Sequence, residues 1–148
     1  MMACTGGHGR WTAPDTECWD DIQQWRTERR ADLLQTRLSL TGRDRRGARD
    51  AACSAIWSTL PELRTACIGF YWPFKAEIDL RVVVAKFLKQ GASAALPVVV
   101  EKARPVEFWS WSPETELRPG VWDIPQPAER QLARPTILLV ALLGFDER

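Results

Sequence analysis

The residues best suited to chemistry gather between positions 69 and 81, in the stretch GFYWPFKAEIDLR. An apolar run ends there at aromatic residues and a proline, and charged residues follow before a helical pattern begins. The rings of Tyr71 and Phe74 can stack on a planar ligand. The carboxylates of Glu77 and Asp79 can accept hydrogen bonds from ring N–H groups. Asp79 can also serve as a helix cap, whereas Glu77 has no such structural role. The stretch therefore predicts either a simple connection or a ligand site in which Glu77 is the better candidate for a ligand contact.

A pair of arginines is the second candidate. Arg26 and Arg30 lie four residues apart in a helical pattern, so their guanidinium groups project from one face. Such a pair can bind phosphate oxygens. Glu28 and Asp32 lie nearby and offer a simpler interpretation, in which they neutralise the two arginines.

Tryptophans set among prolines are the third candidate. They occur in EFWSW at 107–111 and in GVWDIPQP at 120–127. Stacked indoles can bind a sugar or a ring system, or can close a small core. Composition does not choose between these interpretations.

Hydrophobic periodicity predicts the elements that must position these side chains. A first helix begins at Asp15 or Thr16 and continues through Leu38, and a second begins at Thr41, whose capping box includes Asp44. The second helix ends at Leu60, before a proline, and a third begins at Leu80 and stops at Gly91. Strands are predicted at 66–71, 95–100, 106–111 and 137–143, and a long loop at 112–135.

This alternation predicts an α/β fold with a mostly parallel sheet. Pro97 favours an edge or bulge for the second strand. The apolar run 137–143 suggests a central strand buried on both faces. In open α/β sheets, ligands bind beyond the carboxyl ends of strands, and residues 72–79 form such a loop.

Composition excludes several classes of function. The chain has 148 residues, a net charge of +1 and four cysteines without CxxC spacing, and His8 is its only histidine, so a zinc site is not expected. The balanced charge argues against nucleic-acid or membrane binding, and the basic cluster 43–49 is interpreted as a solvated helix face. Residues 1–14 are expected to form a flexible leader, in which Gly6–Gly9 lacks the context of a phosphate loop. Without a secretory signal or a long apolar run, we expect a cytoplasmic protein.

These pieces together resemble one known family. The stretches WRTERRADLLQTRLSL, GFYWPFKAEIDLR, GASAALPVVVEKARPVEFWSW, GVWDIPQPAER and PTILLVALLGFD follow one another between residues 22 and 146. In this order they are similar to the 5-formyltetrahydrofolate cyclo-ligases, also called methenyltetrahydrofolate synthetases. Each motif is weak alone, and their common order makes the resemblance specific.

The resemblance implies a three-layer, Rossmann-like fold and an enzyme that uses ATP and Mg²⁺. Its reaction would convert 5-formyltetrahydrofolate to 5,10-methenyltetrahydrofolate and release ADP and phosphate. The family's basic pair on the first helix matches Arg26 and Arg30, which would bind ATP phosphates. The substrate contacts implied by the resemblance are Tyr71, Phe74, Glu77 and Trp122. Small molecules would be its only partners, and we expect a monomer.

The sequence departs from the family at several positions. Arg26 stands where relatives often have Lys, Asp123 where they have Gly or Asn, and Ala141 where they have Pro. The family also continues beyond Gly-Phe-Asp into a glycine-rich segment that holds ATP phosphates and the metal. We therefore interpret residues 15–148 as the N-terminal portion of a single cyclo-ligase-like domain, without metal ligands of its own and without turnover as given.

Two other hypotheses remain open. The chain could be an inactive fragment or a non-catalytic member of the family that at most binds folate. It could also be a general nucleotide- or sugar-binding α/β domain whose similarity is limited to the fold.

Overall fold

A computed structural model describes residues 18–144 of the chain. The chain divides into two compact units, Met1–Ser39 with Leu142–Arg148, and Leu40–Ala141. The elements are α1 (Trp19–Ser39), α2 (Gly42–Thr59), η1 (Pro61–Arg64), β1 (Cys67–Phe70), α3 (Arg81–Leu88), β2 (Ser93–Val98), β3 (Glu107–Ser110), β4 (Leu117–Pro119), η2 (Val121–Asp123), β5 (Pro125–Pro127) and β6 (Ile137–Leu139). The predicted leader, the predicted helix start at Asp15 or Thr16 and the Gly6–Gly9 segment lie outside the described residues.

Helix α1 forms the described part of the first unit together with Leu142–Gly144. Its extent through Ser39 confirms the helix predicted from the apolar spacing. Asp20 and Asp21 lie in its first turn, where carboxylates favour the positive end of the helix dipole. In its last turn Arg37 donates a hydrogen bond from Nη2 to the carbonyl oxygen of Leu142, at 3.1 Å.

Helix α2 opens the second unit with the predicted cap. The Asp44 backbone N–H donates to Thr41 Oγ1 at 3.2 Å, and the Thr41 hydroxyl donates in turn to Asp44 Oδ2 at 2.7 Å. The helix ends as predicted before Pro61, where the Leu60 N–H donates to the Ile56 carbonyl. Helix α3 ends near Gly91, whose φ of 104° is a left-handed conformation that glycine adopts readily.

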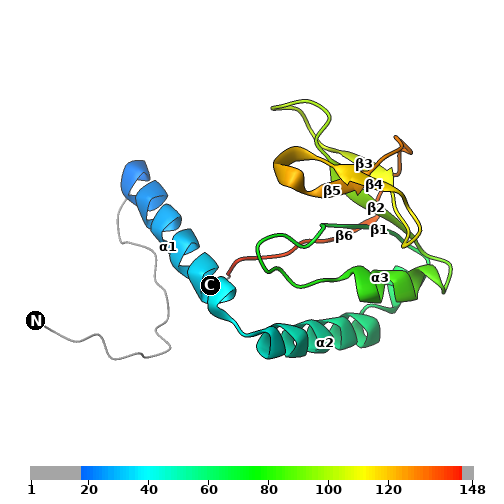
Figure 1. Ribbon diagram of the computed structural model, residues 1–148, viewed down its shortest axis with the longest axis horizontal. Helices are drawn as coiled ribbons and strands as arrows, with labels where there is room; N and C mark the ends of the chain where they lie inside the picture. The colour runs from blue at the N-terminus through cyan, green and yellow to red at the C-terminus, as the bar shows by residue number, and fades with distance from the viewer. Residues whose placement is uncertain (1–17, 145–148) are drawn as a thin grey trace, which may run out of the picture. The chain divides into compact units, whose positions relative to one another are not determined.

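The sheet confirms the predicted fold class. Its strand order is β3-β2-β1-β6, in which β1 pairs in parallel with both β2 and β6, and β2 pairs antiparallel with β3. Helices α2 and α3 contact each other and lie along one side of this sheet (Figure 1). The fold is α/β, with a mostly parallel sheet and flanking helices.

The core of the second unit lies between α3 and the sheet. Every second residue of β1 points to the same face, so Ile68 and Phe70 are buried together. They belong to one apolar cluster with Val83, Val84 and Phe87 of α3. This packing fixes the end of β1 relative to the start of α3, and therefore fixes both ends of the loop 71–80.

The prediction of a central, doubly buried strand at 137–143 is wrong. Strand β6 has three residues and lies at the edge of the sheet, next to β1 alone. The side chain of Leu138 is 50% exposed and that of Val140 is 55% exposed. An apolar run shows that a strand can be buried, but the pairing order decides whether it is.

Strand β2 is an inner strand, so the edge position predicted from Pro97 is wrong for the strand as a whole. The pairing of β2 with β1 nevertheless ends at Ala95, and Pro97 has only β3 as a neighbour. Pro97 pairs with Phe108 of β3. The backbone carbonyl of Phe108 accepts a hydrogen bond from the Ala133 N–H, so this carbonyl points away from β2. The missing N–H of Pro97 thus costs no hydrogen bond in the β2–β3 ladder.

The predicted loop 112–135 contains a two-stranded hairpin, β4–β5. Its prolines hide it from sequence patterns, because proline is depleted in strands. In the structure Pro119 pairs with Pro125. The neighbouring ladder bond runs from the Gly120 N–H to the Ile124 carbonyl, so the prolines occupy positions that need no N–H.

Candidate active site

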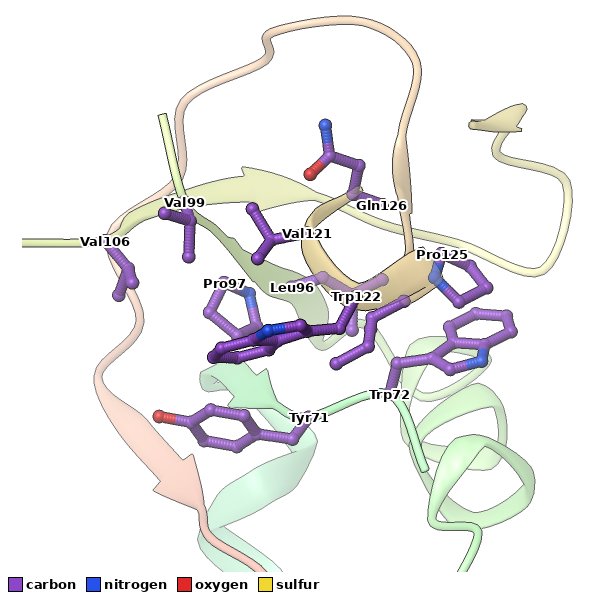
Figure 2. A pocket seen from close by; sticks show the side chains of 11 residues that line it. Tyr71, Trp72, Leu96, Pro97, Val99, Val106, Val121, Trp122, Pro125 and Gln126 are labelled. Carbon is purple, nitrogen blue, oxygen red and sulfur yellow. The ribbon is translucent and has the colours of Figure 1, made fainter. Parts of the chain in front are cut away.

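A cavity of about 270 Å³ opens in the second unit beyond the carboxyl ends of β1 and β2 (Figure 2). This is the edge of the sheet at which the sequence predicted a ligand. The residues that line it are Tyr71, Trp72, Leu96, Pro97, Val99, Val106, Val121, Trp122, Ile124, Pro125 and Gln126. They come from the loop after β1, from β2 and the loop after it, and from the β4–β5 hairpin.

The wall of the cavity is aromatic and aliphatic. None of its side chains is charged, and its polar groups are the Tyr71 hydroxyl, the Gln126 amide and the indole N–H groups of Trp72 and Trp122. Such a lining suits a planar, largely apolar ring that carries a few hydrogen-bonding groups at its edge. The structure therefore brings together Tyr71 and Trp122, two of the predicted substrate residues.

Trp122 is held in an unusual conformation. Its φ and ψ are 57° and 29°, and Asp123 has a φ of 58°, so two consecutive non-glycine residues are left-handed. The Ile124 N–H donates to the Val121 carbonyl at 3.2 Å and closes this turn. The left-handed conformation costs roughly 1–2 kcal/mol for a residue with a side chain. It also explains why Gly or Asn would suit the position of Asp123.

Phe74 and Glu77 do not line the cavity. They form a tight turn in which the Glu77 N–H donates to the Phe74 carbonyl at 3.1 Å and the Phe74 N–H donates to Glu77 Oε2 at 3.2 Å. The residues between them, Lys75 and Ala76, are both left-handed, with φ of 45° and 59°. The prediction that Glu77 lacks a structural role is therefore wrong, since its carboxylate holds this turn. Sequence reasoning missed it because the turn contains neither Gly nor Asn.

Asp79 is engaged by Arg81. Its Oδ1 accepts hydrogen bonds from the backbone N–H and from Nε of Arg81, at 3.1 and 2.8 Å, and its Oδ2 accepts one from Nη2 at 2.6 Å. The hydrogen bond from the Arg81 side chain is the main reason that the pKa of Asp79 is lowered. The structural interpretation of Asp79 is thus supported, although Leu80, rather than Asp79, occupies the N-cap of α3.

In the first unit, Arg26 and Arg30 line one hollow on α1. This hollow has a volume of about 230 Å³ and also includes Trp19, Gln23 and Thr27. Within residues 18–144 neither arginine forms an ion pair.

The acidic neighbours of these arginines are engaged elsewhere. Glu28 accepts a hydrogen bond from Gln24 at 3.0 Å, and Asp32 pairs with Arg29 at 3.0 Å. The interpretation that Glu28 and Asp32 neutralise Arg26 and Arg30 is therefore wrong.

Metal ligands do not gather in the described part of the chain. Between residues 18 and 144 no three side chains of His, Cys, Asp or Glu form a group that could hold a metal ion. Within this range the structure therefore shows no site that holds a metal ion through three protein side chains. In the same range, no helix combines the length and the apolar character that a membrane span needs.

Comparison with solved structures supports this family resemblance. The NMR structure of the 5,10-methenyltetrahydrofolate synthetase of Aquifex aeolicus is 25% identical, with a TM-score of 0.67 over 82% of this chain and 68% of that one. In fold and in the order of its motifs the chain resembles the methenyltetrahydrofolate synthetase, or 5-formyltetrahydrofolate cyclo-ligase, family. This confirms the resemblance found in the sequence motifs.

A second member of the family shares the fold. It is the 5,10-methenyltetrahydrofolate synthetase of Mycoplasma pneumoniae, which is 20% identical, with a TM-score of 0.51 over 57% of this chain and 52% of that one. A scan against protein-family models and a search of curated proteins each gave no match to the sequence.

Proposed function

We propose that this chain serves the ATP- and Mg²⁺-dependent cyclisation of 5-formyltetrahydrofolate to 5,10-methenyltetrahydrofolate, with release of ADP and phosphate. The observation that carries the proposal is the aromatic cavity between Tyr71 and Trp122, at the ligand-binding edge of a synthetase fold. Its uncharged lining suits the pterin ring of a folate better than a sugar phosphate or a free nucleotide phosphate.

In this proposal the pterin ring lies against the indole and phenol rings of Trp122 and Tyr71, and the Gln126 amide bonds to its polar edge. The cavity volume of about 270 Å³ suits the ring system alone, so the remainder of the folate would lie outside it. Phe74 and Glu77 remain candidate substrate contacts, because they lie on the same loop as Tyr71.

Arg26 and Arg30, which form no ion pair within residues 18–144, would bind phosphate oxygens of ATP. Two guanidinium groups in one hollow present concentrated positive charge, which favours an anion with several oxygens. The γ-phosphoryl group would pass from ATP to the formyl oxygen. The second folate nitrogen would then attack the formyl carbon, the carbon–oxygen bond would break, and inorganic phosphate would leave.

The protein's contribution to such a reaction is positioning and charge neutralisation. The stacked rings would hold the formyl-bearing ring in one orientation. The arginines would balance negative charge on the phosphates of bound ATP. The described residues supply no metal cage, so they assign no part of this work to Mg²⁺.

Binding measurements test the two halves of the proposal separately. Trp122→Ala should raise the Kd for 5-formyltetrahydrofolate about tenfold, because stacking on an aromatic residue is worth roughly 1–3 kcal/mol per base. Val82→Ala, on an exposed part of α3, is the control and should leave the Kd unchanged. An unchanged Kd in Trp122→Ala would remove the cavity from folate binding.

For the phosphate half, the double substitution of Arg26 and Arg30 by Ala should weaken ATP binding and leave folate binding unchanged. The matched control replaces Arg43 and Arg45, exposed arginines of α2 without ion pairs in the described structure. Equal loss of ATP affinity in both double variants would show that only net charge matters.

A second function is a folate-binding protein without catalysis. The cavity supports it equally, because the binding of a folate ring there needs neither ATP nor a metal. An assay of methenyltetrahydrofolate absorbance with ATP and Mg²⁺ separates the two functions. Turnover supports the enzyme, and folate binding without turnover supports the binding protein. We also propose that the protein is a cytoplasmic monomer, which sedimentation and cell fractionation would test.

A further inference from the structure

Trp72 forms part of the cavity wall next to Tyr71. The guanidinium of Arg81, on the following helix, stacks on the Trp72 ring. The Arg81 Cζ atom lies 4.2 Å from the centroid of the Trp72 ring. At this distance the guanidinium is attracted by the negative face of the indole. Figure 2 shows Trp72 at the cavity, on the loop that leaves β1.

Arg81 is itself held in place by Asp79. The carboxylate binds both the backbone N–H and the guanidinium of Arg81, so the side chain is tied to the start of its own helix. The two side chains are 36% and 29% exposed, and this partial shielding favours a persistent ion pair over a loose surface contact.

The backbone that carries Asp79 and Arg81 is held in place by packing. Arg81 is the first residue of α3, and Val83, Val84 and Phe87 of the same helix are buried in the core. The backbone carbonyl of Asp79 also accepts a hydrogen bond from the thiol of Cys53, on α2, at 3.9 Å. The position of the guanidinium therefore follows from the packing of two helices.

We propose that Arg81 is a positioning residue of the cavity, which holds the Trp72 indole in the orientation that forms one wall. Asp79 acts through Arg81, because its carboxylate binds Arg81 and its side chain does not line the cavity. The identity of the ligand rests on the proposed function, whereas the positioning of Trp72 does not.

The consequence for activity is a change in ligand affinity. Without the guanidinium, Trp72 can leave its stacked orientation and the cavity loses its fixed width. Ligand binding would then have to order the indole. We expect Arg81→Met to raise the Kd for 5-formyltetrahydrofolate roughly three- to tenfold, in line with a partly shielded cation–π contact. In an active preparation the KM should rise and kcat should stay nearly constant.

Fluorine NMR of the protein labelled with 5-fluorotryptophan tests the positioning directly and without a ligand. Trp72→Phe assigns the resonance of Trp72. Arg81→Met should shift or broaden that resonance, and Arg81→Lys should partly restore it, since a lysine keeps the charge but loses the flat stack. Asp79→Asn, a milder change that keeps the arginine, should give a smaller shift of the same resonance.

The chain offers a matched control in Arg64, whose Cζ lies 5.4 Å from the ring centroid of Trp57, away from the cavity. Arg64→Met should move the Trp57 resonance and leave the Trp72 resonance and the folate Kd unchanged. This control separates a local effect on Trp72 from a general loss of stability.

The outcomes are distinct. An unchanged Trp72 resonance in Arg81→Met, or in Asp79→Asn if the first variant does not fold, overturns the inference. A shifted resonance with an unchanged folate Kd in a protein that binds folate also overturns it, because the wall would then not matter for the ligand. If the wild type binds no 5-formyltetrahydrofolate, the proposed function fails, and the shift of the Trp72 resonance still decides whether Arg81 positions the indole.

Discussion

Replacement of Ala76 by glycine should make the protein more stable, although the same change in most places weakens a protein. Ala76 lies in the turn between Phe74 and Glu77, with a φ of 59°, and its neighbour Lys75 has a φ of 45°. In this left-handed region the Cβ atom crowds the following carbonyl oxygen. Glycine has no Cβ and adopts the conformation without strain.

The magnitude follows from two opposing terms. Relief of the left-handed strain at Ala76 is worth roughly 1–2 kcal/mol. The greater freedom of glycine in the unfolded chain opposes this by about 0.4–1 kcal/mol. The free energy of unfolding should therefore rise by about 0.5–1 kcal/mol, which corresponds to an increase in Tm of about 1–4 °C for a chain of this size.

Urea denaturation of the wild type and of two variants provides the assay. The matched control is Ala85→Gly, the same substitution in the interior of α3, where it should lower the free energy of unfolding by about 0.5–1 kcal/mol. Opposite signs for the two variants would confirm the left-handed turn. If Ala76→Gly destabilises as much as Ala85→Gly does, the backbone at Ala76 is not left-handed, and the structural role given to Glu77 loses its basis.

Three further changes test other parts of the structure. Gly69→Ala should destabilise by about 1–3 kcal/mol, because its Cβ would overlap Leu138 on the neighbouring strand, and Leu138→Ala in the same chain should recover part of the loss in a urea titration. The Arg130 guanidinium lowers the pKa of Glu107 from 4.5 to about 2, so the stabilisation from this carboxylate is present above pH 4.5 and is lost as the pH falls towards 2. The difference in stability between the wild type and Glu107→Gln should accordingly shrink over that range, and a difference that is constant with pH would contradict the ion pair. Asp123→Gly should stabilise the hairpin by about 0.5–1 kcal/mol and raise the Tm, and a lower Tm would argue against a left-handed residue there.

Much of the candidate site could be predicted from sequence because its position depends on local signals. The apolar run before Tyr71 and the helical pattern after Leu80 place a loop at the carboxyl end of a parallel strand, and ligands bind at such ends. The resemblance of the sequence to the family predicts Trp122 as a substrate contact, and the structure places Trp122 in the same cavity as Tyr71. That agreement concerns location, and the substrate contacts themselves remain a prediction.

Other features of the site could not be predicted because they depend on contacts between distant segments or on unusual backbone angles. The turn at Lys75 and Ala76 lacks the Gly or Asn that usually marks left-handed residues. In the sequence nothing distinguishes Arg81 from the other charged residues near it. Only the tertiary structure shows that its guanidinium lies over the Trp72 ring. Neighbouring acidic residues were equally ambiguous, since spacing alone could not show that Asp32 pairs with Arg29 and not with Arg30.

The class of fold, the main helices and the edge of the sheet at which a ligand is expected could all be predicted from local sequence patterns. These follow from hydrophobic periodicity and capping residues such as Thr41, which act over a few neighbouring positions. Only the tertiary structure decided the order of the strands, and with it the exposed edge position of β6. It also decided which side chains share a cavity, because strand order and packing bring together residues as distant in sequence as Tyr71 and Trp122.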